Sequence, residues 1–136
     1  MASLTIGVFC AFGKKMLPDA ESLLLKAFVG SVRLCYGSDA RIILISDQFL
    51  EAAAYAGFVD EVRVCDIDPQ RLLLCRARAY SNILKEHDWQ SPLAFLDYDI
   101  LLLKNIDHVF QSAADIFLTA RGYSKEMPIN GGVLLL

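Results

Sequence analysis

Residues 93–103 read Leu-Ala-Phe-Leu-Asp-Tyr-Asp-Ile-Leu-Leu-Leu, and this stretch decides which fold the chain adopts. Its first four residues are apolar, and Asp97 and Asp99 follow at once. Burying an ionised carboxylate is costly unless a cation or hydrogen bonds compensate it. A run of this kind is typical of a strand that is buried on both faces and carries its polar residues at its carboxyl end.

Apolar runs recur along the chain and alternate with segments of helical periodicity. Strands are expected at residues 4–9, 41–46, 61–65, 93–96, 116–119 and 133–136. Helices are expected from Pro18-Asp19 onward and at 48–56, 70–86 and 109–113. Strands alternating with helices predict an α/β fold, here a Rossmann-like, mostly parallel sheet flanked by helices.

Capping and turn residues mark where these elements begin and end. Gly37 is expected at the C′ position of the first long helix. Asp68-Pro69 is typical of an N-cap followed by proline at the first helical position. Residues 121–128 are expected to form a loop, and Ile129-Asn130-Gly131-Gly132 a tight turn into the final strand.

The composition is that of one compact domain. The chain has 136 residues, of which 55% are hydrophobic and 21% are charged, and its mean hydropathy is +0.41. It is therefore too apolar for a disordered chain and richer in apolar residues than an ordinary soluble domain. The formal net charge of −3 and the isoelectric point of about 5.3 argue against a nucleic-acid partner.

A cytoplasmic location without a membrane segment is the expectation. No apolar run approaches the roughly 18 residues that a membrane helix needs. Residues 1–4 lack the basic start and long apolar core of a signal peptide. The cysteines contain no C-x-x-C pair and are expected to be small buried hydrophobes in a reducing compartment: Cys10, Cys35, Cys65 and Cys75.

The spacing of Asp97 and Asp99 indicates a metal site. In an extended segment, side chains two residues apart point to the same side, where two carboxylates repel each other unless a cation shares them. A hard dication prefers such oxygen ligands. The pair Asp66 and Asp68 has the same spacing, but capping before Pro69 explains it without a metal. The chemistry expected at Asp97 and Asp99 is metal-assisted transfer from a phosphate-bearing substrate.

Three classes of phosphate-handling enzyme use such a site. A P-loop is excluded, because residues 7–15 give G-x5-G-K-K instead of G-x4-G-K-[ST]. A haloacid-dehalogenase-like phosphatase, in which the first aspartate is the nucleophile, stays open as an alternative, although Ile100-Leu101 replace its usual small residue and threonine. The third class is a nucleotide-sugar transferase.

An ordered set of motifs favours this third class. It comprises the opening strand, the arginine-containing segment at 75–80, Phe95-Leu96-Asp97-Tyr98-Asp99-Ile100, and Ile129-Asn130-Gly131-Gly132-Val133-Leu134-Leu135. Together these resemble the GT-A fold glycosyltransferases of family 8, the glycogenin and bacterial galactosyltransferase type. The resemblance implies that residues 1–136 are the nucleotide-sugar-binding, N-terminal part of a single GT-A catalytic domain.

The resemblance also implies an activity and its residues. The enzyme would transfer a hexose-like sugar from a UDP-sugar to an unknown sugar, protein or lipid acceptor, with retention of anomeric configuration. Asp97 and Asp99 would hold Mn2+ or Mg2+ at the diphosphate. The implied nucleotide-sugar site consists of Cys10, Ala11, Phe12, Arg78, Asp97, Tyr98, Asp99, Asn130 and Gly131. Arg71 and Arg76 compete with Arg78 for its role.

The chain departs from the family in two respects. The family's third metal ligand, a histidine near the end of the catalytic domain, has no counterpart, since His87 and His108 lie at other places. The acceptor-binding half has no counterpart either, and the strand-like run at 133–136 is expected to continue into it. A truncated nucleotide-binding module without transferase activity is therefore a second alternative. An exposed edge strand would allow a homodimer.

Overall fold

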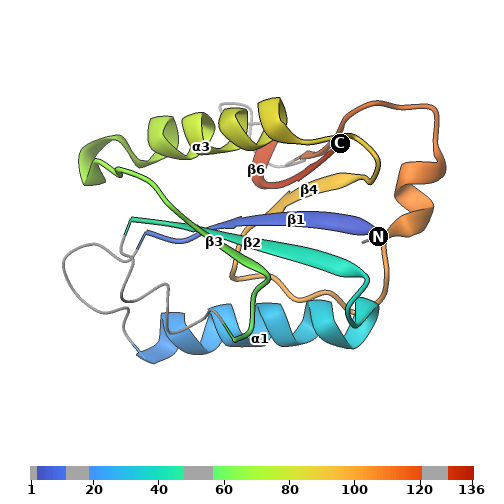
Figure 1. Cartoon of the computed structure of the whole chain (residues 1–136), viewed down its shortest axis with the longest axis horizontal. Coiled ribbons are helices and arrows are strands. Elements are labelled where there is room, and N and C mark those ends of the chain that lie inside the picture. The colour runs from blue at the N-terminus through green and yellow to red at the C-terminus, as the bar shows by residue number, and fades with distance from the viewer. Residues whose placement is uncertain (1–2, 12–18, 48–56, 121–128) are drawn as a thin grey trace.

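The computed structural model describes residues 3–11, 19–47, 57–120 and 129–136. Within these ranges one six-stranded sheet lies between helices on its two faces (Figure 1). The elements in chain order are β1 (Leu4–Phe9), α1 (Asp19–Tyr36), β2 (Ala40–Ser46), β3 (Glu61–Val64), the 3-10 turn η1 (Pro69–Arg71), α3 (Leu72–Glu86), β4 (Leu93–Leu96), the 3-10 turn η2 (Asp107–Gln111), β5 (Phe117–Ala120) and β6 (Ile129–Leu135).

The sheet has the strand order β3-β2-β1-β4-β6-β5. Neighbouring strands from β3 to β4 are parallel, whereas β6 runs antiparallel to both β4 and β5. This confirms the predicted α/β fold with a mostly parallel sheet. The chain places β2 and β3 on one side of β1 and then crosses to β4 on the other side. The strand order therefore reverses at β1, which makes the carboxyl ends of β1 and β4 a topological switch point, where open α/β sheets bind ligands.

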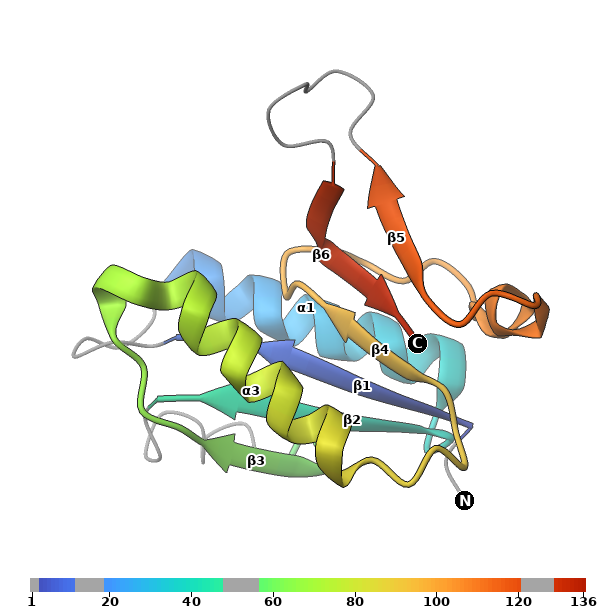
Figure 2. The ribbon, with the colours of Figure 1, turned by 90° about the horizontal axis from the view of Figure 1, so that it is seen from above.

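Both faces of the central strands are buried. Leu4, Ile6 and Val8 pack against α1, and Phe95 packs against Ala79 and Ile83 of α3 on the opposite face. Figure 2 shows α1 and α3 on opposite sides of the sheet, with the β5–β6 hairpin extending beyond them. Burial on both faces explains why the strands are continuous apolar runs instead of alternating patterns.

The predicted caps are present. Gly37 has φ +58°, and its N–H donates to the carbonyl of Arg33 at 2.8 Å, so a residue without a side chain ends α1. The Oδ1 of Asp68 accepts from the N–H of Gln70 at 2.9 Å, which confirms that Asp68 is a cap. The helix after it begins as the 3-10 turn and becomes α-helical only at Leu72.

Two expected elements differ in the structure. Residues 129–132 are part of β6 and not a turn, because Ile129 and Asn130 pair with Ala120 and Thr119 of β5. The helix expected at 109–113 is the 3-10 turn η2. The expected helix at 48–56 and the loop at 121–128 lie outside the described residues.

The cysteines are free thiols, of which Cys10 is buried. The other three are only half-buried, so the expectation that all four are core residues is wrong for them: Cys35, Cys65 and Cys75. Among the described residues, no helix combines the length and the apolar character required to cross a bilayer.

The ion pair between Arg33 and Asp60 connects the end of α1 to β2 and to the residue that precedes β3. The Arg33 guanidinium donates to the carbonyl of Ala40 and to Oδ2 of Asp60, each at 2.7 Å. The same Oδ2 accepts from the N–H of Ile42 at 2.6 Å. Burial tends to raise the pKa of Asp60, but the Ile42 N–H and the Arg33 guanidinium outweigh it, so that the pKa is lowered.

We expect Asp60→Asn to lower the free energy of unfolding by about 0.5–1 kcal/mol near neutral pH, since this side chain is 42% exposed and solvent screens the pair. A lowered folded-state pKa gives stability above the ordinary value of 3.8 that is lost as pH falls through the folded value. Urea unfolding should therefore show the difference from the native chain shrinking below that pH. Asp39→Asn is the control, and a difference that grows on acidification would contradict this assignment.

Gly7 in the centre of β1 lies under the ring of Phe95. The strands are in register at these two residues. A Cβ at Gly7 would lie 2.7 Å from Cδ1 of Phe95, closer than packed carbon atoms approach. The bare backbone of Gly7 therefore makes room for an aromatic side chain of the neighbouring strand.

Gly7→Ala is expected to destabilise the fold by about 1–3 kcal/mol, because the ring must move within a packed core. Gly30 is the matched control, since it is exposed in α1 and has open space where a Cβ would be. Gly30→Ala should stabilise the chain by about 0.5–1 kcal/mol through helix propensity. Equal effects of the two substitutions in urea unfolding would refute the steric explanation.

Candidate functional site

A pocket of about 370 Å³ lies at the carboxyl ends of β1 and β4. Its walls come from the loop after β1, the first turns of α3 and the loop after β4. The described lining residues are Phe9, Ala11, Leu72, Leu73, Arg76, Asp97, Tyr98 and Asp99. Ligand pockets commonly measure about 300–1,000 Å³, so this pocket is large enough for a small molecule.

Asp97 and Asp99 meet in this pocket, although not in the expected backbone conformation. β4 ends at Leu96, and Tyr98-Asp99 form a turn, so the prediction of an extended motif is wrong. The side chain of Asp97 is 38% exposed, and Asp99 is exposed. The turn nevertheless brings both carboxylates to the same pocket.

Arg76 supplies the positive charge of the pocket. Its Nη1 lies 3.3 Å from Oδ1 of Asp97. Arg78 is exposed and is not among the described lining residues. Two residues along a helix turn the side chain by about 200°, so Arg76 and Arg78 face opposite ways. Arg71, the other arginine considered for this role, has its Nε 3.9 Å from Oδ2 of Asp68.

The buried face of α3 explains why Arg76, and not Arg78, lies in the pocket. The buried residues of α3 are Ala79 and Ile83. Arg76 precedes Ala79 by three residues and therefore shares its inward face. Leu72 lies one turn earlier on the same side and also lines the pocket, a contribution that the sequence analysis missed.

The charges around Asp97 are not balanced. Burial raises the pKa of Asp97, the guanidinium of Arg76 lowers it, and the negative charge of Asp99 raises it again, so that the pKa lies above its ordinary value. One arginine thus does not offset the desolvation and the second carboxylate. An added cation would be stabilised at this place.

β6 lies next to Asp97 through the backbone of Gly132. The Asp97 N–H donates to the carbonyl of Gly132 at 2.9 Å. β6 is irregular here: Leu118 pairs with Leu134 but Thr119 pairs with Asn130, so the register of β6 against β5 shifts between these two pairs. The sequence analysis expected Asn130 and Gly131 at the site in a turn, whereas they belong to the irregular strand β6 and are not among the described lining residues of the pocket.

The nucleotide-binding residues predicted after β1 do not all lie in the pocket. Cys10 is 1% exposed and belongs to the core on the α1 face. Ala11 forms part of the pocket wall, and Tyr98 lines the pocket from the β4 side. Phe12 lies outside the described residues.

α1 fixes the segment that follows Asp99. The hydroxyl of Ser31 accepts from the N–H of Leu102 at 3.0 Å. The hydroxyl of Tyr36 accepts from the N–H of Ile106 at 2.7 Å and donates to Asp107 at 2.9 Å. Burial, and then Asp107, outweigh the Ile106 hydrogen bond and raise the pKa of Tyr36 to about 12. These bonds restrain the acidic turn from its C-terminal side.

The apolar run after Asp99 is only partly buried. Leu101 is 59% exposed and Leu103 is 90% exposed. The buried apolar residues beside the acidic pair are therefore residues 93–96, which precede it, and not the run that follows it. The cause is that residues 100–106 cross the surface as a loop instead of continuing β4.

The two carboxylates suit a hard dication by their chemistry. Carboxylate oxygens are the preferred ligands of Mg2+ and Mn2+. Over the ranges that the structure describes, His, Cys, Asp and Glu form no cluster of three or more. His87 lies at the other end of α3, where its Nε2 is 2.7 Å from the carbonyl of Ser91, and His108 lies in η2.

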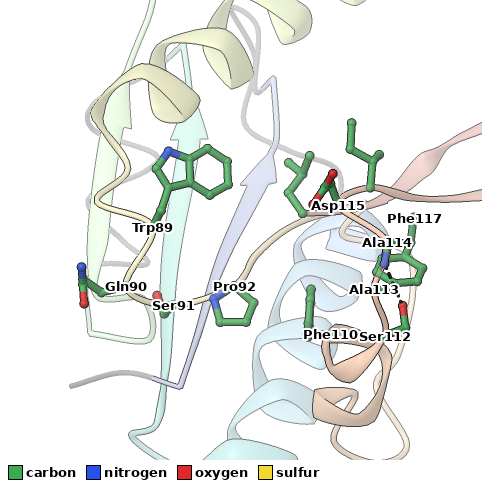
Figure 3. A pocket seen from close by; sticks show the side chains of 12 residues that line it. Trp89, Gln90, Ser91, Pro92, Phe110, Ser112, Ala113, Ala114, Asp115 and Phe117 are labelled. Atoms are coloured by element: carbon green, nitrogen blue, oxygen red, sulfur yellow. Dashed lines mark hydrogen bonds between the residues drawn. The ribbon is translucent and has the colours of Figure 1, made fainter.

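A larger hollow of about 640 Å³ lies at the opposite edge of the sheet, meaning the end where β4 begins (Figure 3). Trp89 and Pro92 stand on one side of it and Phe110 and Phe117 on the other. Asp115 is the one titratable residue in its described lining. Because it has no paired charges and lies away from the switch point, the smaller pocket is the better candidate site.

Solved structures provide the comparison for this fold. Two crystal structures of the glycosyltransferase GlyE from Streptococcus pneumoniae TIGR4, one of them the apo-form, match it with TM-scores of 0.60 and 0.61. The sequence identity is 14%, and the matches cover 100% of this chain and 34% of each neighbour. The chain thus has the fold of part of a glycosyltransferase and spans about a third of those structures.

Sequence comparisons add no family. No protein-family model and no curated protein matches the chain. The likeness to GlyE supports a glycosyltransferase fold but does not single out family 8.

In the chelator-treated protein, we expect the carboxyl group of Asp97 to titrate above 3.8. Asp99→Asn should lower its pKa, because a negative charge is removed, and Arg76→Met should raise it, because a positive charge is removed. Carbon-13 NMR of the carboxyl groups measures both shifts, with Asp115→Asn at the opposite edge as the control. An Asp97 titration that ignores Asp99→Asn would show that the two carboxylates do not share one site.

Proposed function

We propose that this chain forms the donor-binding part of a metal-dependent glycosyltransferase that uses a UDP-sugar. The observation that carries the proposal is the pocket itself: Asp97, Asp99 and Arg76 converge at the switch point between β1 and β4. The fold shared with GlyE supports the same class of activity.

The charge balance of the pocket supports a cation at the acidic pair. Glu61, the first residue of β3, pairs with both Arg41 and Arg63. Burial tends to raise the pKa of Glu61, but these two arginines outweigh it and the pKa is lowered. The pKa of Asp97 is raised in spite of Arg76. A pair of carboxylates left with surplus negative charge is suited to Mn2+ or Mg2+, with Asp97 and Asp99 as the ligands. When bound, the metal would neutralise charge on the diphosphate leaving group.

The remaining walls suit the other parts of a nucleotide sugar. Arg76 offers a guanidinium to a phosphate or sugar oxygen next to Asp97. Tyr98 offers a ring to the nucleobase, and Leu72 and Leu73 add an apolar wall. In this proposal Arg76 takes the role that the family resemblance gives to Arg78, and the main chain around Gly131 approaches the sugar.

The rest of the reaction belongs to the same proposal. We infer a hexose-like donor sugar, retention of its configuration, and an acceptor that is a sugar, a protein or a lipid. We also propose, from the sequence, that the protein acts in the cytoplasm and forms a homodimer.

Isothermal calorimetry with UDP, with and without Mn2+, tests the proposal. We expect UDP to bind at least tenfold more tightly with Mn2+, and Asp99→Ala to abolish this gain because it removes a ligand oxygen. Asp66→Ala in the other D-x-D pair is the matched control and should bind as the native chain does. Binding that is independent of the metal, or equal in the Asp99→Ala variant, would rule out the metal site.

The alternatives give different results. Hydrolysis of a simple phosphate ester that is lost in Asp97→Asn would indicate a haloacid-dehalogenase-like phosphatase. Metal-dependent UDP binding without release of UDP from UDP-sugars in the presence of acceptors would indicate a nucleotide-binding module.

A further inference from the structure

Two stacked aromatic rings lie next to the acidic pocket, between β4 and α3. The ring centroids of Tyr80 and Phe95 are 3.9 Å apart, and the ring planes differ by 13°. Arg76 lies one helical turn before Tyr80, with its guanidinium carbon 6.0 Å from the Tyr80 centroid. Nη1 of the same guanidinium lies 3.3 Å from Oδ1 of Asp97. The rings thus connect the core of the sheet to the charged pair.

The position of this stack depends on Gly7. Phe95 is 1% exposed and lies over the backbone of Gly7, where a Cβ would meet two ring carbons at 2.7 and 2.8 Å. Ile83 of α3 packs in the same cluster. Because Gly7 and Ile83 restrict the Phe95 ring, the ring gives Tyr80 a rigid surface to stack on.

We propose that Tyr80 is a positioning residue that holds Arg76 beside Asp97. An arginine side chain has many rotamers, and ordering it at the moment of binding costs affinity. The Tyr80 ring removes rotamers that point away from Asp97 and attracts the guanidinium weakly through its face. Tyr80 itself touches neither donor nor metal. The inference rests on the proposed function, since it deepens the role of Arg76 in donor binding.

A double-mutant cycle on UDP affinity in the presence of Mn2+ tests this role. We expect Tyr80→Leu to weaken UDP binding about threefold to tenfold, the cost of one unordered side chain. Tyr80→Phe keeps the ring and should bind within about twofold of the native chain, since the ring carries the stacking. In the Arg76→Ala background, Tyr80→Leu should cause no further loss, because its effect passes through Arg76. Phe110→Leu at the opposite edge is the aromatic-to-leucine control.

Either of two results would overturn the proposal. One is an equal loss from Tyr80→Leu with and without Arg76, which would indicate a general structural role. The other is a loss in Tyr80→Phe as large as that in Tyr80→Leu, which would indicate the hydroxyl. Tyr80→Met replaces Tyr80→Leu if the latter does not fold.

A measurement without ligand separates this inference from the proposed function. The Nε–Hε signal of Arg76, assigned with Arg76→Ala, should shift in Tyr80→Leu and keep its position in Tyr80→Phe. If UDP does not bind the native chain, the proposed function fails, and this signal still tests the contact. An Arg76 signal that is unchanged in Tyr80→Leu would refute the positioning role.

Discussion

Burial of the sheet on both faces is the constraint on which the rest of the structure depends. Side chains of β1 and β4 such as Ile6, Phe95 and Leu96 are no more than 2% exposed. An ionised group between the strand ends would lose its hydration without a partner. Charged groups of these strands are therefore confined to their ends. Because the strand order reverses at β1, the carboxyl ends of β1 and β4 open a pocket where such groups meet.

The acidic residues of this fold fall into two kinds. Asp60 has arginine and backbone partners within its own structure, and Glu61 has two arginines, so the charged form of each is stabilised. Asp97 has one arginine and a second carboxylate, and its charged form is disfavoured. The first kind holds strands and helices together. The second kind has described neighbours that leave its ionised form disfavoured, which is more typical of a functional site than of a structural ion pair.

The elements that sequence reasoning identified are those set by local pattern. β1, β2, β4 and α1 follow from apolar runs, periodicity and caps, and Asp97 and Asp99 follow the carboxyl end of β4 as predicted. The missed features depend on tertiary contacts. The glycines of residues 129–132 favour a turn locally, but pairing of Ile129 and Asn130 with β5 makes the segment part of a strand. The choice of Arg76 over Arg78 needed the direction of the buried face of α3, which only the packing against Phe95 and its neighbours determines.

β6 follows the other described strands in sequence yet lies inside the sheet, between β4 and β5. During synthesis, the outer edge of β4 therefore stays unpaired until residues 129–135 have left the ribosome. Over that interval Asp97 lacks the carbonyl of Gly132 that receives its N–H. An open strand edge is a template for pairing with other chains. The hydrogen bond that fixes the start of the acidic turn thus forms late, and the β4 edge is open to mispairing until β6 covers it.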